Sequence, residues 1–498
     1  MIIAVSGLPA DYERTLSHLA AQYVKDAEVQ MDADSPIDGL KVRFTEKRRL
    51  DQVYVSATAR AEGFEDTASF QKPVIEANMH SKVGKQTAAH VFVKLLTSWT
   101  GKTQPWGTLT GIRPTKLYHQ MYRSGLSHSD IKKTLKDDYL ISDEKIAMLE
   151  RIVKRQLEVL PDLYEIKKGV SIYIGIPFCP TMCAYCTFPA YAINGKNGSV
   201  SEFLNGLYYE MEQTGAWLKE HNIPVTTIYF GGGTPTSIEA EEMDALYSQM
   251  HKVFPDLNQV REVTVEAGRP DTISAEKLAV LNKWNIDRIS INPQSFHNET
   301  LRAIGRHHSV EETVDKYELA VRHGVDNINM DLIIGLPNEG VPEMKHNLSE
   351  TKKLDPASLT VHTLSFKRAS TMTKQKDKYN VAGPEEIQQM MDLTNQWTDE
   401  NEYEPYYLYR QKNILGNLEN VGYAKAGKES LYNMIIMEEV QTIIGLGCGA
   451  ASKWVDPVSE KITRMANPKD PISYIERYEE YTHRKIDTLN ELFRPITP

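Results

Sequence analysis

Short runs of β-branched and other apolar residues recur along the middle of the chain, from Val170 to about residue 366. They read VSIYIGI, VTTIYF, EVTVEA, DRISIN, NINMDLIIG and SLTVHTL. Stretches with apolar residues at helical spacing separate them, for example SEFLNGLYYEMEQTGAWLKE and SVEETVDKYELAVRHG. Because strands that alternate with helices pair in parallel through right-handed crossovers, the pattern predicts an α/β fold. Six such strands indicate an open or partial (β/α) barrel, with ligands at the carboxyl ends of the strands.

The chain follows other patterns on both sides of these strands. The N-terminal part combines strand-like and helical segments, and its last helical segment, DEKIAMLERIVKRQLEVL, stops at Pro161, because proline removes a helical hydrogen bond. After about Lys367 the alternation of strands and helices is lost. We therefore predict an N-terminal α+β accessory domain over residues 1–165, the barrel over residues 166–366, and a mixed C-terminal region over residues 367–498.

The overall composition, with 41% hydrophobic and 25% charged residues, is typical of a folded chain with a large core. The formal net charge of −10 argues against a nucleic-acid-binding surface that covers the protein, because the summed field would repel an anion. No segment reaches the roughly 18 to 20 apolar residues that span a membrane, and we find no pattern of a secretion signal. We therefore expect a cytoplasmic protein with no membrane span and no nucleic-acid partner.

Three of the four cysteines, Cys179, Cys183 and Cys186, lie within eight positions in the loop after the first barrel strand. This loop is at the predicted ligand-binding end. Iron–sulfur clusters are held by cysteine thiolates, and spacings of three and then two residues let one loop surround a single cluster. Three thiolates would bind three irons of a four-iron cluster and leave the fourth iron open to a ligand from outside the chain.

A zinc site and a disulfide are two alternatives to an iron–sulfur cluster for these thiols. Zinc could take the three thiolates and the distant Cys448, although structural zinc sites usually consist of two paired groups of ligands and only one group is present. A disulfide between cysteines so close in sequence would be unusual in a reducing compartment. Cys448, in the glycine-rich GLGCGAAS, is more typical of a small buried residue in a turn than of a ligand.

The segment YIGIPFCPTMCAYC, residues 173–186, resembles the cluster loop of the radical S-adenosylmethionine (SAM) enzymes, and among them the oxygen-independent coproporphyrinogen III oxidase family. The N-terminal part, with GTLTGIRPTKL, resembles the HemZ-type branch. The resemblance implies a partial (β/α)6 radical SAM barrel with a 4Fe-4S cluster on Cys179, Cys183 and Cys186, and SAM on the open iron. A SAM-derived radical would drive oxidative decarboxylation of a tetrapyrrole, from coproporphyrinogen III to protoporphyrinogen IX, in haem biosynthesis. The cluster would need an electron donor, which we expect to be of the flavodoxin or ferredoxin type.

Further residues near the predicted strand ends match SAM-binding positions of the family. GGGTP follows the second strand, and its missing side chains would let the backbone approach a ligand closely. Each residue alone could be structural, whereas their order and spacing match together. The resemblance implies that the first SAM contacts Tyr173, Gly232, Gly233, Thr234 and Glu266, the last at the ribose. It implies that a second SAM contacts Tyr185, Gln294, Arg306 and Asp331, and that Ala451 offers a backbone contact to SAM.

The sequence departs from the best-characterised oxidases at two positions of the cluster loop region. Phe188 stands where those enzymes have a further cysteine, and Gly175 stands where they have a histidine. Both changes concern the substrate and the second SAM rather than the cluster. An alternative function is therefore a haem-binding carrier, or chaperone, of the same family, and another is a radical SAM enzyme that modifies haem.

A substrate with four propionates needs local positive charge, because the chain as a whole is acidic. Guanidinium groups pair with carboxylates through two hydrogen bonds, which favours arginine over lysine. The Tyr-rich stretch at residues 402–424 is either an ordinary packed segment or a wall of the tetrapyrrole pocket. Candidate propionate anchors near the strand ends and beyond are Arg269, Lys367, Arg368, Arg410 and Lys412.

Overall fold

The computed structural model describes residues 1–32, 39–74, 79–188, 190–193, 198–367 and 370–494. The chain forms two compact units, Met1–Glu150 and Arg151–Pro498. The boundary between them falls within the helix α5 (Asp143–Val159). Across the described parts of the chain, no helix has both the length and the apolar character that a membrane crossing requires.

The first unit is an α+β domain built on a five-stranded sheet with the strand order β2-β1-β3-β4-β5. Buried and exposed side chains alternate along β3 and β4, so one face of the sheet is covered, and α1 and α2 contribute to the same hydrophobic core. The strands are β1 (Ile2–Ser6), β2 (Glu28–Met31), β3 (Leu40–Arg48), β4 (Gln52–Ala61) and β5 (Phe64–Pro73). The helices before α5 are α1 (Glu13–Tyr23), α2 (His80–Thr100), α3 (Pro114–Arg123) and α4 (His128–Asp137).

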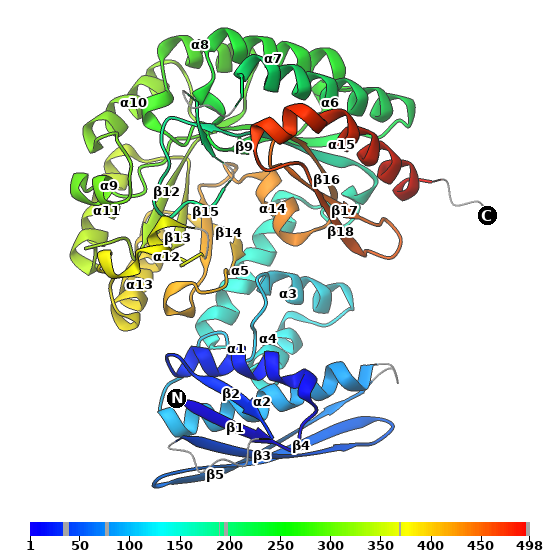
Figure 1. Ribbon diagram of the computed structural model, residues 1–498, viewed down its shortest axis with the longest axis vertical. Helices are drawn as coiled ribbons and strands as arrows, with labels where there is room; N and C mark the ends of the chain where they lie inside the picture. Colours follow the sequence, from blue (N-terminus) through cyan, green and yellow to red (C-terminus); the bar gives the residue numbers. More distant parts are fainter. Residues whose placement is uncertain (33–38, 75–78, 189, 194–197, 368–369, 495–498) are drawn as a thin grey trace. The chain divides into compact units, whose positions relative to one another are not determined.

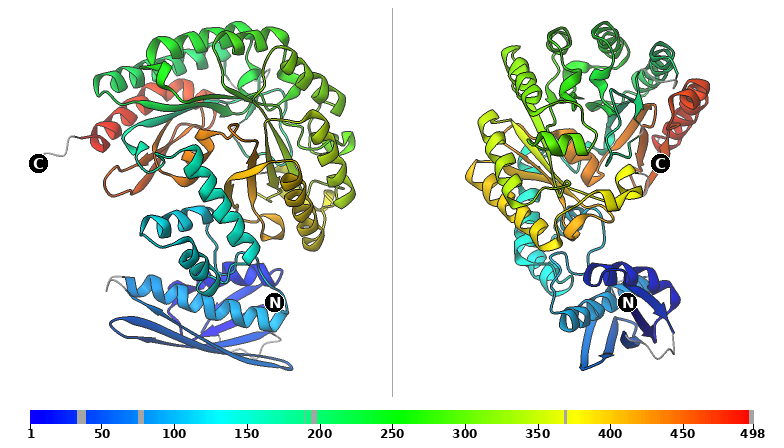
Figure 2. Two further views of the ribbon diagram at one scale, coloured as in Figure 1. Left: turned by 180° about the vertical axis from the view of Figure 1, so that it is seen from behind. Right: turned by 60° about the vertical axis from the view of Figure 1, so that its left-hand side comes forward.

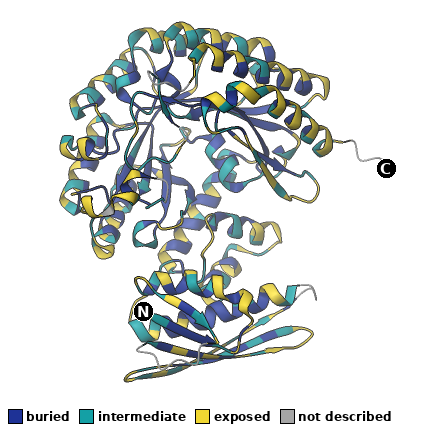
Figure 3. Ribbon diagram, viewed as in Figure 1, coloured by how far each residue is buried: buried dark blue, intermediate teal, exposed yellow. Residues whose placement is uncertain are grey.

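The second unit contains the six parallel strands that the sequence predicts. They pair in chain order, as a curved sheet with helices on its outer side (Figures 1 and 2). The strands are largely buried (Figure 3), because helices cover their outer side chains and the inner side chains face one another. The prediction of a partial (β/α)6 barrel is confirmed. The strands are β6 (Val170–Ile176), β9 (Val225–Gly232), β10 (Glu262–Glu266), β11 (Arg288–Ser290), β12 (Ile328–Ile334) and β13 (Ser358–Thr363). The helices between them are α6 (Val200–Glu220), α7 (Ala240–Val253), α8 (Ala275–Lys283), α9 (Asn298–Ala303), α10 (Val310–Arg322) and α11 (Val341–Leu354), and a short β7 (Phe178–Cys179) pairs with β8 (Tyr191–Ala192) in the cysteine loop.

The C-terminal residues extend this sheet at both edges. The strand order is β14-β15-β13-β12-β11-β10-β9-β6-β16-β17-β18. At one edge β16 pairs in parallel with β6, and at the other β15 pairs antiparallel with β13. The added strands are β14 (Glu404–Tyr409), β15 (Asn420–Ala424), β16 (Thr442–Gly447), β17 (Ala451–Val455) and β18 (Ile462–Ala466). The added helices are α12 (Thr371–Lys374), α13 (Pro384–Glu400), α14 (Leu431–Glu438) and α15 (Pro471–Leu492).

The short helix α14 carries Tyr432 into the barrel. The carboxylate of Glu262, in β10, accepts hydrogen bonds from the backbone N–H groups of Leu431 at 2.7 Å and Tyr432 at 3.2 Å. An anion at this place satisfies N–H groups that lack partners within the helix. The ring of Tyr432 then stacks on Tyr229 of β9, with 4.4 Å between ring centroids. A C-terminal element therefore forms part of the inner wall of the barrel.

A buried carboxylate ties the C-terminal helix α15 to the barrel. Glu210, in α6, forms an ion pair with Lys485 and accepts a hydrogen bond from the hydroxyl of Tyr474 at 2.7 Å. It also accepts one from the backbone N–H of Gly447 at 2.6 Å. Burial lowers the pKa of Lys485 while Glu210 raises it. The network fixes the turn after β16 as well as the helix.

Candidate active site

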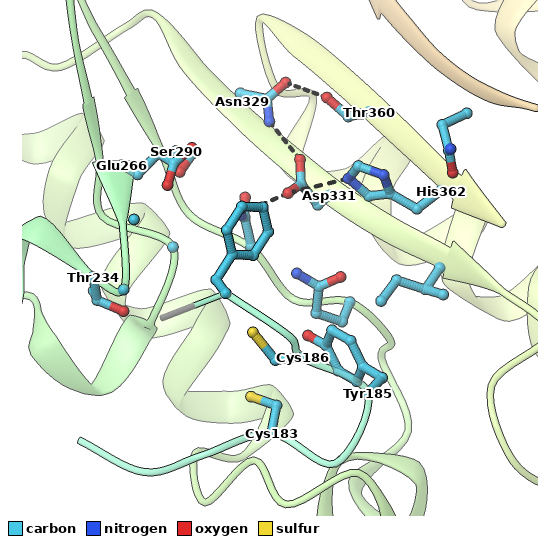
Figure 4. A pocket seen from close by; sticks show the side chains of 18 of the residues that line it. Cys183, Tyr185, Cys186, Thr234, Glu266, Ser290, Asn329, Asp331, Thr360 and His362 are labelled. Carbon is cyan, nitrogen blue, oxygen red and sulfur yellow. Dashed lines mark hydrogen bonds and ion pairs between the residues drawn. The ribbon is translucent and has the colours of Figure 1, made fainter. Parts of the chain in front are cut away.

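A cavity of about 430 Å³ lies at the carboxyl ends of the barrel strands and reaches side chains inside the barrel. In Figure 4 the thiols of Cys183 and Cys186 lie at one end, and Asp331 and His362 lie at the other. Ala451, at the exposed start of β17, does not line this cavity. The predicted site residues that do line it are Tyr173, Cys179, Cys183, Tyr185, Cys186, Gly232, Gly233, Thr234, Glu266, Gln294, Arg306 and Asp331.

The three clustered thiols fit an iron–sulfur cluster in kind and in placement. All four cysteines of the chain are free of disulfides, and the three in the loop border one cavity, whereas the Cys448 thiol donates to the carbonyl of Pro468 at 3.4 Å outside it. Burial raises the pKa of Cys179 to about 11, so a thiolate there needs the positive charge that bound iron supplies. Within the described ranges, no three His, Cys, Asp or Glu side chains already converge as a metal site.

The glycine-rich segment after β9 runs directly beside the cysteine loop. A Cβ atom on Gly233 would lie 2.5 Å from the carbonyl oxygen of Phe178, so only glycine fits there. Gly232 has φ 109°, a conformation that favours glycine. The hydroxyl of Thr234 lies 3.3 Å from the Sγ atom of Cys179. The segment therefore brings bare backbone to the edge of the predicted cluster site.

Glu266 ends β10 and faces the cavity. Its Oε1 atom accepts a hydrogen bond from the hydroxyl of Tyr229 at 2.5 Å. Burial raises the pKa of Glu266 from 4.5 to about 7, the hydrogen bond from Tyr229 lowers it, and the charge of Asp331 raises it. The side chain is thus an acceptor poised between its protonated and ionised forms. Tyr173 stacks beside Tyr229 at 6.1 Å between centroids and continues the aromatic wall.

Asp331, in β12, lies at the centre of a set of polar contacts in the cavity wall. It accepts hydrogen bonds from Asn292 and Asn329, both at 2.8 Å, and lies 3.5 Å from the Nε2 atom of His362. Burial alone would raise the pKa of Asp331, but His362 and Asn329 lower it, so the carboxylate is ionised. The Nδ1 atom of His362 lies 3.3 Å from the hydroxyl of Tyr409. Sequence reasoning missed His362, although a histidine inside the apolar run SLTVHTL was a usable signal.

Gln294 and Arg306 also line the cavity, in the segments that follow β11 and α9. Gln294 has φ 65°, and its Oε1 atom is buried without a hydrogen-bond partner in the described structure. Arg306 donates to the carbonyls of Gly268 at 3.1 Å and Asn292 at 2.7 Å. Burial would lower the pKa of Arg306, but Tyr185 and Cys183 together outweigh this effect and raise it. A buried polar atom without a partner is costly unless a ligand or water satisfies it, so this part of the cavity fits a polar ligand.

The candidate propionate anchors do not all reach the cavity. Arg269 lines it, but its guanidinium is buried and bonded to protein groups. Arg410 is buried and Lys412 is exposed, and neither lines the cavity. Arg368 lies outside the described residues. Lys367 lines the cavity and is half-buried, and it therefore remains a candidate anchor for a propionate carboxylate.

Comparisons with known proteins agree with this geometry. The model of the radical SAM superfamily matches residues 173–349. The oxygen-independent coproporphyrinogen-III oxidase-like protein HemZ of Bacillus subtilis is 58% identical over 500 residues, which cover 100% of this chain and 99% of HemZ. The haem chaperone HemW of Bacillus subtilis is 30% identical over 326 residues, which cover 64% of this chain and 81% of HemW. The structure of coproporphyrinogen III oxidase HemN from Escherichia coli matches with a TM-score of 0.51 at 18% identity, over 66% of this chain and 73% of HemN, and supports the fold.

The barrel and the cysteine loop together define a radical SAM enzyme. The chain belongs to the radical SAM superfamily and, within it, to the coproporphyrinogen-III oxidase-like family of HemZ, as the sequence motifs predicted. Enzymes of this superfamily use a 4Fe-4S cluster and SAM, which are therefore the cofactors of this protein.

Proposed function

We propose that this protein catalyses the oxygen-independent oxidative decarboxylation of coproporphyrinogen III to protoporphyrinogen IX in haem biosynthesis. The observation that carries the proposal is a single cavity in which three clustered thiols face a deep polar and aromatic barrel interior. The similarity to HemZ along the whole chain supports the same reading. We further propose that the protein works in the cytoplasm with an electron donor of the flavodoxin or ferredoxin type.

In this proposal the chain holds two cofactors and excludes water around them. The cluster with SAM, when bound, supplies the hydrogen-abstracting chemistry, and the protein positions one substrate C–H bond against it. Glu266 would accept hydrogen bonds from the ribose of SAM, beside Tyr173. Cys179, Cys183 and Cys186 would hold the cluster. The amino and carboxylate groups of SAM would contact Gly232, Gly233 and Thr234. A second SAM would contact Tyr185, Gln294, Arg306 and Asp331. Ala451 would offer a backbone contact to SAM.

Lys367 and Phe188 are the proposed contacts for the tetrapyrrole. Both line the cavity, and the Nζ atom of Lys367 lies 5.8 Å from the ring centroid of Phe188. Phe188 is 60% exposed, which is unusual for so large an apolar side chain, so its ring is free to lie against a macrocycle. Burial lowers the pKa of Lys367, and an ion pair with a propionate would stabilise its charged ammonium group.

A haem carrier is the second candidate, and Phe188 is the observation that favours it. The position lacks the further cysteine of the best-characterised oxidases, and the haem chaperone HemW is among the similar proteins. An aromatic side chain at the mouth of the cavity would suit a bound haem as well as a reacting porphyrinogen.

One anaerobic assay separates the two candidates. The protein is reconstituted with iron and sulfide and given SAM, a reductant and coproporphyrinogen III. We expect 5′-deoxyadenosine, carbon dioxide and a vinyl product in the parent protein, and none of them in Cys183→Ala. Tight haem binding without carbon dioxide release would refute the oxidase and support the carrier.

A further inference from the structure

We propose that Arg269 is a positioning residue that ties the cysteine loop to the end of β10 and raises the reduction potential of the cluster. The inference uses the cofactors of the superfamily and does not depend on the proposed substrate.

Asp271 fixes the guanidinium of Arg269. The Nε atom donates to Oδ1 at 3.0 Å, and Nη2 donates to Oδ2 at 2.9 Å, so the two planar groups are joined by two hydrogen bonds. Arg269 is only 3% exposed. Burial alone would raise the pKa of Asp271, but the hydrogen bonds and charge of Arg269 lower it, which keeps the carboxylate ionised. The hydroxyl of Thr272 donates to the backbone carbonyl of Arg269 at 2.7 Å and holds the main chain as well.

The remaining nitrogen of the same guanidinium reaches the cysteine loop. Nη1 donates to the hydroxyl of Thr181 at 3.0 Å and to its carbonyl at 3.3 Å. It also lies 3.8 Å from the Sγ atom of Cys183. Arg269 follows Glu266 by three residues, so one side chain links the strand end that carries the proposed ribose acceptor to the loop that carries the thiols.

The positive charge of Arg269 would affect the reduction potential of the cluster that the loop binds. Three thiolates give a bound cluster net negative charge, and reduction adds one electron to it. A fixed cation beside a ligand sulfur, in a site with little water to screen it, stabilises the reduced form more than the oxidised form. Arg306 is a second cation near Cys183. His308 is held neutral, because burial and the two arginines lower its pKa to about 3.

The test compares full-length variants reconstituted anaerobically, without any tetrapyrrole. Arg269→Gln removes the positive charge and the planar guanidinium group. Asp271→Asn weakens the hydrogen bonds that fix Arg269 but keeps the positive charge of Arg269. Arg155→Gln is the control, because it removes another ion-paired arginine, 2.7 Å from Glu429, that does not line the cavity. Iron per chain and the midpoint potential from an EPR-monitored titration are measured.

We expect Arg269→Gln to lower the ratio of reduced to oxidised cluster about tenfold at a fixed potential, a shift of about 59 mV to more negative values. Arg155→Gln should keep the parental potential and iron content. A parental potential in Arg269→Gln would overturn the proposal. If Arg269→Gln loads too little iron to titrate, the iron content of Asp271→Asn decides: a lower iron content supports the proposal, and a parental iron content overturns it. Failure of the proposed decarboxylation would leave every one of these results unchanged.

Discussion

We expect the Glu266 carboxylate to contribute to ligand binding and to lower the stability of the folded state. The substitution Glu266→Gln tests both effects. The side chain faces the cavity beside Tyr229, and burial raises its pKa from 4.5 to about 7. A raised carboxyl pKa means that the folded state disfavours the ionised form. Below pH of about 4.5 the group is protonated in both states and costs nothing, and above pH of about 7 it is ionised in both and the full cost applies.

The size of the effect follows from the two pKa values. A difference of about 2.5 pKa units corresponds to about 3 kcal/mol at pH 8 and to about 1 kcal/mol at pH 5. Glutamine has the same shape and no charge, so Glu266→Gln should recover these amounts. For a folded unit the size of Arg151–Pro498, that corresponds to a rise in melting temperature of about 4 °C at pH 8 and about 1 °C at pH 5.

Thermal unfolding of the chain without cofactors, at both pH values, measures this difference. Glu318→Gln is the matched control, because Glu318 is an exposed acid with 56% of its side chain accessible and should change little at either pH. In the reconstituted protein, Glu266→Gln should weaken SAM binding by roughly one to two decades, since a charged acceptor is worth about 1.5 to 3 kcal/mol. An equal gain in stability at pH 5 and pH 8, or no gain, would refute the reasoning.

Three further outcomes follow from contacts of single side chains. Cys183→Ala should remove most cluster iron, whereas Cys448→Ala should leave it, because the Cys448 thiol bonds to a carbonyl outside the cavity; iron analysis that finds equal loss in both would contradict the three-thiol site. Lys367→Ala should slow the release of carbon dioxide from coproporphyrinogen III, whereas Lys412→Ala should not, because Lys412 is exposed and lies outside the cavity. Equal rates of release in the two variants would place the propionate contact elsewhere. Lys485→Met should destabilise the second unit by about 3–5 kcal/mol, because it leaves a buried carboxylate of α6 unpaired; an unchanged unfolding midpoint in urea would contradict this.

Local sequence patterns were enough to predict the barrel and the chemical class of the site. Six apolar runs separated by amphipathic stretches became β6 and β9–β13, because strand and helix periodicity are properties of neighbouring residues. The cysteine spacing is equally local, since one loop carries all three thiols. Glu266, at the end of β10, reached the cavity because parallel strands bring their carboxyl ends to the same edge, whereas Asp331 lies within β12 rather than at its end and reaches the same cavity from inside the barrel.

The partner that each polar side chain meets became known from the folded chain and not from local sequence patterns. Arg269 looked like a propionate anchor, but Asp271 and the cysteine loop engage it. His362 joined the polar wall through Asp331, which belongs to a different strand. The C-terminal residues, without a clear period, proved to be both edges of the barrel sheet. These outcomes depend on contacts between residues far apart in sequence, which the order of residues along one segment does not encode.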